Sequence, residues 1–135
     1  SDHAPHLKKN KDKTYPNSPS GMPGVQTLMP VMLNHINEGK LTIEQLINFV
    51  CENPVKIFGI KNKGFIKEGY DADFTIVDMN KKIVIKNEKI ESKCGWSPFH
   101  EFEFKGTPVA AIIAGQIKMR EGKIIGDPTG KPILF

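Results

Sequence analysis

The sequence has little cysteine, tryptophan or tyrosine: two Cys, one Trp and two Tyr among 135 residues. Two cysteines can form one bridge at most, which excludes a disulfide scaffold and favours a reducing cytoplasm. The longest apolar run, residues 109–114, is far shorter than the about 20 residues that a membrane helix needs. No secretory signal pattern stands at the start. These absences predict a cytoplasmic protein that has no membrane partner.

Charge is present in ordinary amounts but is unevenly placed. Charged residues make up 25% of the chain, its formal net charge is +4, and four lysines crowd into residues 8–13. No stacking aromatic side chains are interleaved with these lysines, so we interpret them as a solvated loop and predict no nucleic-acid partner. The chain begins with Ser1 rather than Met, as expected of a piece cut from something larger.

The first 59 residues divide into a loop and a helical stretch. Residues 1–24 are polar and rich in Pro and Gly, which predicts a long loop, and loops of that length are usually functional or disordered. From Val25 to Ile36 apolar residues recur every three or four positions, which predicts a helix that ends at Gly39. Thr42 and Gln45 form a capping box for a second helix. Asn53 is expected to cap a short third helix with Pro54 in its first turn and Gly59 past its end.

The remainder of the chain favours short strands. We expect them at residues 72–78, 82–86, 109–114, 116–120 and 123–125. Turns at Gly115 and at Glu121-Gly122 predict an antiparallel hairpin or meander.

Groups able to bind metal or transfer protons are concentrated in residues 1–6. Asp2 is a hard oxygen ligand and a candidate general base, and His3 and His6 can bind metal or hold a carboxylate. On spacing alone, a solvated tail explains these residues equally well. No H-E-x-x-H and no Cys pair completes a metal site. The other notable side chains are assigned to packing or to the surface: His35, His100, Cys51, Trp96 and Phe99, the last two covering apolar surface at a domain junction.

Five motifs in order resemble landmarks of the cyclic amidohydrolases, and most of all of the dihydroorotases. The resemblance runs from Ser1 to about Gly122. The motifs are D-H-A-P-H at 2–6, P-S-G-M-P-G-V-Q-T at 19–27, C-E-N-P with I-F-G at 51–59, G-F-I-K-E-G-Y-D-A-D at 64–73 and K-C-G-W-S-P-F at 93–99.

The resemblance implies an α/β fold, a (β/α)₈ TIM barrel that carries a small β-sandwich. A barrel takes about 250 residues, so this chain would be a C-terminal fragment. Residues 1–60 would be the end of strand eight, its long active-site loop and the closing helices of the barrel. Residues 61–135 would be the C-terminal strands of the sandwich.

The resemblance also implies an activity, the metal-dependent and reversible hydrolysis of the cyclic amide of dihydroorotate to N-carbamoyl-aspartate in pyrimidine biosynthesis. Asp2 matches the aspartate that binds metal and passes the proton of the attacking water to the departing nitrogen. His6 matches the histidine that holds the substrate carboxylate, and Ser20 and Gly21 match loop positions that contact the ring. The cofactor would be binuclear zinc, most of whose ligands lie outside this chain. Lys8 to Lys13 would attract an anionic substrate.

Partners and alternatives follow from the same resemblance. The implied partners are the missing N-terminal portion, a second copy of the chain, and aspartate carbamoyltransferase. Because only one metal ligand is present, we expect the chain alone to be inactive. The alternatives are an allantoinase or hydantoinase, and a non-catalytic homologue or structural fragment.

Overall fold

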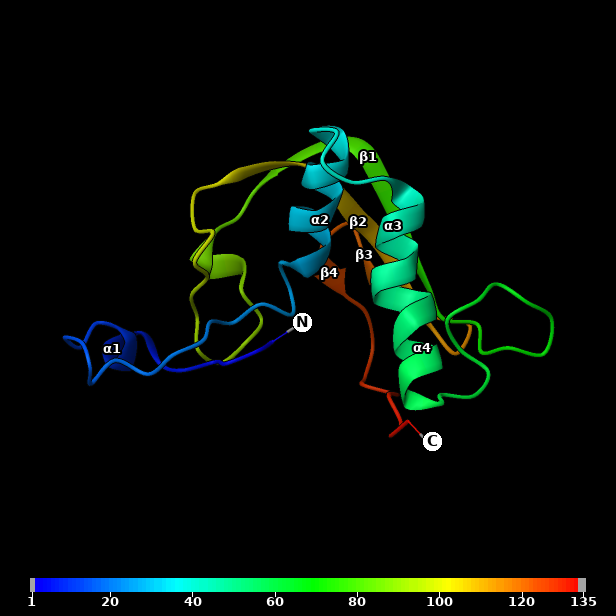
Figure 1. Cartoon of the computed structure of the whole chain (residues 1–135), viewed down its shortest axis with the longest axis horizontal. Coiled ribbons are helices and arrows are strands. Elements are labelled where there is room, and N and C mark those ends of the chain that lie inside the picture. The colour runs from blue at the N-terminus through cyan, green and yellow to red at the C-terminus, as the bar shows by residue number, and fades with distance from the viewer. Residues whose placement is uncertain (1, 134–135) are drawn as a thin grey trace. The chain divides into compact units, whose positions relative to one another are not determined.

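A computed structural model describes residues 2–133 of the chain as an α/β structure with a four-stranded sheet in the order β1-β2-β3-β4 (Figure 1). Contacts group the chain into two units. One comprises the residues up to Asn34 together with Asn80–Thr107, and the other comprises His35–Met79 together with the residues from Pro108 onward. The domain boundary predicted near residue 60 concerns the complete protein and stays a prediction.

The expected loop over residues 1–24 contains one short helix that the sequence analysis missed. Helix α1, Lys8–Lys11, is a single turn in which the N–H of Asp12 donates to the carbonyl of Lys8. The Lys8 side chain pairs with the Asp12 carboxylate one turn later. Four residues are too few for an apolar periodicity to show, which is why the pattern did not reveal α1.

Helix α2, Leu28–Asn37, confirms the first predicted helix. Its end is a Schellman motif: Lys40 N donates to His35 O, and Gly39, at φ 71°, donates to Ile36 O. Leu33 is fully buried, as its spacing predicts. Val25 was wrongly assigned to the same apolar face, because it precedes the helix, lies in a turn and is 60% exposed.

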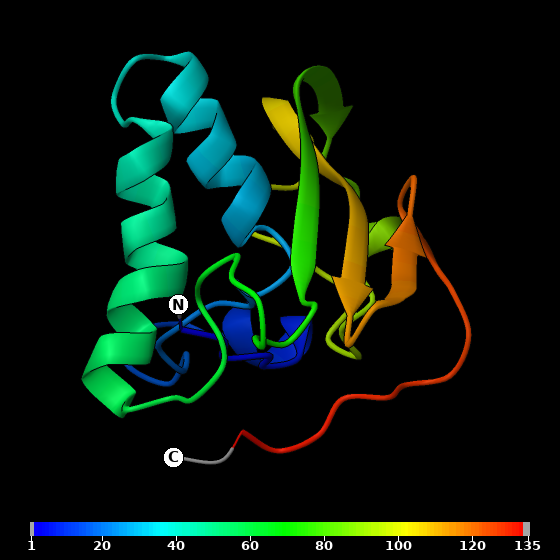
Figure 2. The ribbon, with the colours of Figure 1, turned by 90° about the vertical axis from the view of Figure 1, so that its right-hand side faces the viewer.

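The second and third predicted helices run as one (Figure 2). Helix α3, Ile43–Ile47, leads into the π-helical turn η1, Asn48–Glu52, and then into α4, Asn53–Phe58. The Thr42–Gln45 capping box is confirmed, with both reciprocal bonds made. The predicted cap at Asn53 is wrong, because this residue has helical φ and ψ and its N–H donates to Asn48 O, five residues back. Pro54 cannot donate to Val50, and the widened turn fits around that missing donor.

The first two strands are longer than predicted. Strand β1, Phe74–Val84, joins the two segments expected at 72–78 and 82–86. Strand β2, Glu103–Ile113, begins six residues before the predicted Val109. Ala72 O accepts from Gly115 N near one end of the pair, and Ile85 N donates to Phe102 O near the other, so the strands run antiparallel. A short 3₁₀ helix, η2, Asn87–Lys89, lies between β1 and β2 in the sequence.

The meander at the end of the chain is confirmed. Strand β3, Gln116–Arg120, pairs antiparallel with β2 and with β4, Lys123–Ile124. Both two-residue turns have positive φ at both positions, with 49° and 76° at Ala114-Gly115 and 49° and 74° at Glu121-Gly122. Such turns match the twist of paired strands, which is why their sequence signal was reliable.

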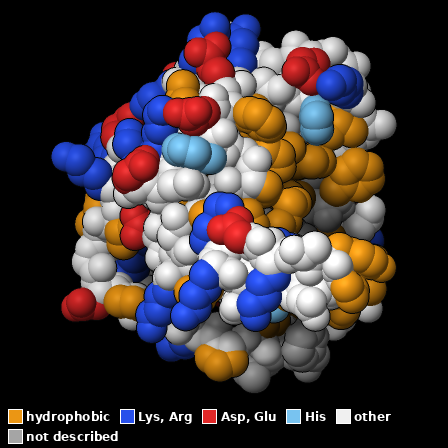
Figure 3. Space-filling view, turned by 90° about the vertical axis from the view of Figure 1, so that its left-hand side faces the viewer, with side chains coloured by type: hydrophobic (Ala, Val, Ile, Leu, Met, Phe, Trp, Pro, Cys, Tyr) orange, Lys and Arg blue, Asp and Glu red, His pale blue; other side chains and the backbone are white. Residues whose placement is uncertain are grey.

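The buried core is small. Buried apolar side chains are few among the described residues: Leu33, Leu46, Ile85, Cys94, Trp96 and Phe104. Apolar side chains are also visible on the surface (Figure 3), and on the α3–α4 helix Phe49, Ile57 and Phe58 are 53%, 73% and 60% exposed. Exposed apolar side chains gathered on one helix are of the kind found at interaction surfaces.

Both cysteines carry free thiols. Cys94 is buried, whereas Cys51, which we interpreted as a packing residue, is half-buried. Loss of hydration raises the pKa of the Cys51 thiol, and the neighbouring Glu52 charge adds to that rise. Within residues 2–133, every helix is too short or too polar to cross a bilayer.

Candidate active-site loop

The segment that carries Asp2 runs beside the glycine-rich end of the same loop. Ala4 N donates to Met22 O at 2.9 Å. A Cβ built on Gly21 would lie 2.6 Å from the Cβ of Ala4 and 3.4 Å from Oδ2 of Asp2, and one on Gly24 would lie 2.7 Å from Asp2 O. Gly21 also has φ 84°, which favours glycine. The two glycines therefore leave the room in which Asp2 sits, with its carboxylate exposed.

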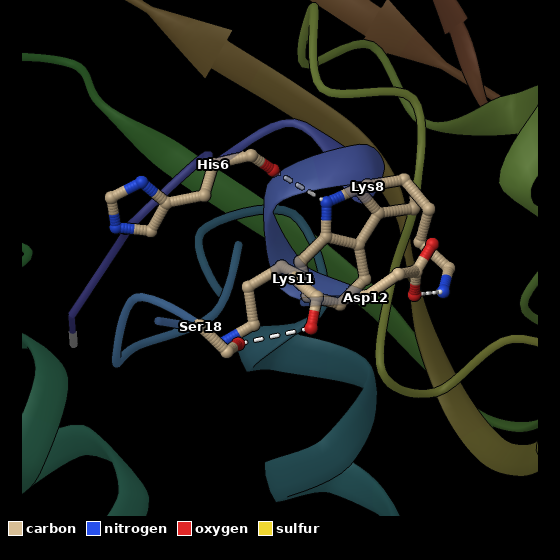
Figure 4. Close-up of polar contacts among 6 residues, drawn as sticks. His6, Lys8, Lys11, Asp12 and Ser18 are labelled. Atoms are coloured by element: carbon tan, nitrogen blue, oxygen red, sulfur yellow. Dashed lines mark hydrogen bonds and ion pairs between the residues drawn. The ribbon is translucent and has the colours of Figure 1, made fainter. Parts of the chain in front are cut away.

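His6 is half-buried and its main chain is fixed from a distant part of the sequence. Its N–H donates to Ala4 O at 2.9 Å, and its carbonyl accepts the indole N–H of Trp96 at 2.7 Å. Figure 4 shows the carbonyl directed at the indole while the imidazole points away from it. His3 contacts the loop differently, since its Nδ1 accepts a long bond from Val25 N at 3.5 Å.

Lys11 crosslinks the loop to itself. Its ammonium donates to Pro19 O at 2.5 Å and to Gly21 O at 3.0 Å, and its own carbonyl accepts from Ser18 Oγ at 2.9 Å (Figure 4). Together with the Lys8–Asp12 pair, these contacts engage two of the four lysines within their own loop. Lys11 donates to neutral carbonyls and keeps its positive charge. The attraction of an anionic substrate by Lys8 to Lys13 stays a prediction.

The structure brings some predicted site residues together. Asp2 and Gly21 are neighbours, and Ser20, which is exposed, adjoins Gly21 along the chain. Sequence reasoning missed Trp96 and Lys11 as contacts of this loop. A signal for Trp96 was available, because it is the single Trp of the chain and stands in the K-C-G-W-S-P-F motif.

Metal binding by this chain alone is not supported. Among residues 2–133, no three His, Cys, Asp or Glu side chains come close enough to hold an ion together. A single exposed carboxylate such as Asp2 is too small a donor set for a protein-bound divalent cation. The described residues therefore do not form a complete metal site by themselves.

A second polar cluster has a different character. The Lys63 ammonium contacts the carboxylates of Asp71 at 2.8 Å and of Asp73, and these two acids raise the pKa of Lys63, Asp71 most. Lys63 in turn lowers the pKa of Asp73, whose Oδ1 also accepts the N–H of Ala114 at 2.7 Å. The charge of Lys63 is balanced by the carboxylates that it contacts, which is typical of structural ion pairs.

Comparisons with known proteins agree on one family. Residues 2–118 match the amidohydrolase family. The dihydroorotase of Pyrococcus furiosus is 42% identical to this chain over 134 residues, covering 99% of this chain and 31% of that protein. The chain thus spans about a third of the length of the curated relatives it matches.

Two solved structures have the same fold over most of the chain. An L-hydantoinase (dihydropyrimidinase) from Arthrobacter aurescens is 32% identical with a TM-score of 0.79, covering 82% of this chain and 25% of that one. A D-hydantoinase (dihydropyrimidinase) from a Thermus species reaches a TM-score of 0.85 at 23% identity, covering 94% of this chain and 29% of that one. The second likeness concerns the fold alone.

Proposed function

This chain belongs to the amidohydrolase family, and on that premise we propose that it is part of a dihydroorotase. The reaction is the reversible opening of the cyclic amide of dihydroorotate to N-carbamoyl-aspartate, a step of pyrimidine biosynthesis. The observation that carries this proposal is the 42% identity to a dihydroorotase over 99% of the chain. The hydantoinase at 32% identity over 82% of the chain supports the shared framework and makes a hydantoinase the second candidate.

The complete protein would contain a TIM barrel. Residues 1–60 would close it and supply its active-site loop, and residues 61–135 would complete a small β-sandwich. The match of 94% of this chain to 29% of a hydantoinase supports the proposal that the chain is one portion of a larger protein. The N-terminal portion of the same protein is then the first partner, and a second copy and aspartate carbamoyltransferase are further ones. We place the protein in the cytoplasm.

Asp2 is the residue to which we assign the chemistry. Its carboxylate would be one ligand to zinc in the complete protein, with the other ligands supplied by the absent portion. When bound, the metal supplies positive charge that polarises the amide carbonyl and makes water more acidic. The Asp2 carboxylate would take the proton of the attacking water and deliver it to the ring nitrogen as the C–N bond breaks. The Gly21 and Gly24 contacts support this role, because they leave space beside an exposed carboxylate.

His6, Ser20 and Gly21 would bind the substrate. An imidazole N–H can donate to the substrate carboxylate, which selects anionic rings over neutral ones. Gly21 has no side chain, so its backbone can approach a ring closely, and the adjacent exposed Ser20 can contribute a main-chain contact.

The test is a substrate comparison on the complete protein that contains this segment. Initial rates are measured with dihydroorotate, allantoin and hydantoin at equal concentration and with a defined metal content. We expect turnover of dihydroorotate to exceed the other two by at least about a hundredfold, a ratio that requires specific recognition of the carboxylate. Preference for hydantoin would establish the second candidate instead.

The isolated chain gives the complementary test. With one metal ligand among its residues, the purified 135-residue polypeptide should show no turnover of dihydroorotate. Turnover by this chain without added protein would contradict the assignment of the missing ligands to another portion. Absence of activity in the complete, metal-loaded protein would instead indicate a non-catalytic homologue.

A further inference from the structure

The main chain around His6 belongs to no regular element, although Ala4 N donates to Met22 O and Leu7 O accepts from Asn10 N and Lys11 N. His6 lies in residues 2–7, which form neither helix nor strand. Its N–H reaches only as far as Ala4 O, two residues back. An irregular segment of this kind depends on side chains elsewhere to fix its position. For His6 that side chain is Trp96, 90 residues later, whose indole donates to its carbonyl.

Trp96 is itself firmly held. It is 8% exposed and follows a tight turn in which Gly95 N donates to Ser92 O at 2.9 Å. The next residue, Ser97, is 5% exposed and donates its N–H to Oδ1 of Asn87 at 2.9 Å. The backbone is therefore held on both sides of Trp96, and the side chain itself is buried.

The contact fixes the backbone and leaves the imidazole to act. The bond joins the indole N–H to the His6 carbonyl, and the imidazole of His6 extends away from that carbonyl (Figure 4). A contact with the carbonyl does not use the ring nitrogens that would meet a ligand. Such an arrangement fixes the backbone position of His6 and leaves both ring nitrogens of the imidazole available to a ligand.

We propose that Trp96 is a positioning residue for substrate binding, acting through the main chain of His6. This proposal rests on the proposed function, in which His6 holds the substrate carboxylate. A binding group displaced by about 1 Å loses much of its effect on a bound substrate. The indole N–H therefore contributes to the affinity for the anionic ring without touching it.

The first test is a double-mutant cycle in the complete enzyme. Trp96→Phe keeps an aromatic ring and removes the donor, and His6→Ala removes the imidazole. We expect Trp96→Phe to raise KM for dihydroorotate by about three- to tenfold, the range that one neutral hydrogen bond supports, with kcat changed less than about twofold. In the His6→Ala background, the same change should leave KM within measurement error.

An equal rise of KM in both backgrounds would overturn the proposal, because Trp96 would then act independently of His6. An unchanged KM in the single variant would also overturn it. If Trp96→Phe fails to fold, replacement of Trp96 by benzothienylalanine keeps the shape of the indole and substitutes sulfur for the N–H, and the same cycle applies.

The second test needs no substrate. Trypsin can cut after the lysines of residues 8–13, directly beyond His6, and mass spectrometry follows those fragments in the complete protein. We expect cleavage there to accelerate by about three- to tenfold in Trp96→Phe, and to stay unchanged in the control Phe102→Leu, which loses an exposed ring of the same unit. An unchanged cleavage rate in Trp96→Phe would overturn the proposal that the indole N–H holds the main chain of His6. Failure of the complete protein to open dihydroorotate would overturn only the proposed function. The trypsin experiment tests the contact between Trp96 and His6 separately.

Discussion

The loop of residues 2–24 and the helix of residues 43–58 are stabilised in opposite ways. The helix is held by consecutive backbone bonds, a capping box and a π turn, so its shape is spread over many equivalent interactions. The loop is held at a few points by side chains that donate to carbonyls, chiefly Lys11 and Trp96. The stability of the helix is thus spread over many hydrogen bonds, whereas the conformation of the loop depends on a few single contacts.

This difference predicts where substitutions will act. Changes in the loop should alter binding or turnover while the free energy of unfolding stays nearly constant, because few buried contacts depend on the loop. Changes at tightly packed positions near the helix should alter stability first. The predictions below test this separation, from the largest expected effect to the smallest.

Asp2→Asn in the complete protein should have the largest effect. It removes the proton acceptor and one negative charge, so turnover in both directions should fall by at least about a thousandfold. The midpoint of thermal unfolding, measured on the same metal-loaded sample, should change little. The matched control is Asp12→Asn, in the same loop, where the acid only pairs with Lys8 and activity should fall less than about twofold. Near-normal turnover in Asp2→Asn would show that the aspartate is misassigned.

Gly64→Ala should lower the free energy of unfolding. The added Cβ would lie 2.6 Å from Cγ2 of Val55 and 2.9 Å from Cys51 O, at φ 82°. Strain and overpacking together should cost about 2–4 kcal/mol of stability. Gly69→Ala is the control, because it has the same φ of 82° with nothing within 4 Å, and should cost about 1 kcal/mol. Denaturant unfolding measures both, and equal losses would show that the contacts beside Gly64 do not matter.

His6→Ala should raise KM for dihydroorotate by about 10- to 100-fold, the range expected for a hydrogen bond to a charged group. The free energy of unfolding should be unchanged, in keeping with the exposed surroundings of the loop. A neutral cyclic amide that is also a substrate provides the control, since its KM should not respond. A KM for dihydroorotate that stays at the wild-type value would remove His6 from the binding site.

Asp73→Asn should produce the smallest effect and a dependence on pH. The contacts with Lys63 and with the N–H of Ala114 hold the pKa of Asp73 below its ordinary value of 3.8. Their stabilisation is therefore present above pH 3.8 and is lost as pH falls through the lowered pKa. Because the side chain is 35% exposed, we expect a loss of about 0.5–1 kcal/mol at pH 7. The difference between wild type and variant, measured by urea unfolding, should shrink below pH 4; a difference that grows there would contradict the assignment.

Features with a local cause could be predicted from the sequence. The Thr42–Gln45 box, the Gly39 and Gly59 helix ends and the turns at residues 114–115 and 121–122 each depend on a few adjacent residues. The prediction of a helix cap at Asn53 was wrong because the preceding helix continues through a π turn at this point. The full lengths of β1 and β2 could not be predicted, because they depend on pairing between segments far apart in sequence.

The candidate site divides in the same way. Asp2, His6, Ser20 and Gly21 could be singled out because they stand in short motifs. Their surroundings could not, since the indole of Trp96 meets His6 across 90 residues and Lys11 turns back to Pro19 and Gly21. Contacts of this type leave no periodicity, so only the folded chain reveals them.

One measurement tests the central assignment most directly: anomalous diffraction at the zinc edge from crystals of the complete, metal-loaded protein. Our account predicts an ion about 2.0–2.2 Å from a carboxylate oxygen of Asp2, with its remaining ligands supplied by residues outside this 135-residue chain. An ion bound without Asp2, with that carboxylate facing solvent, would contradict it.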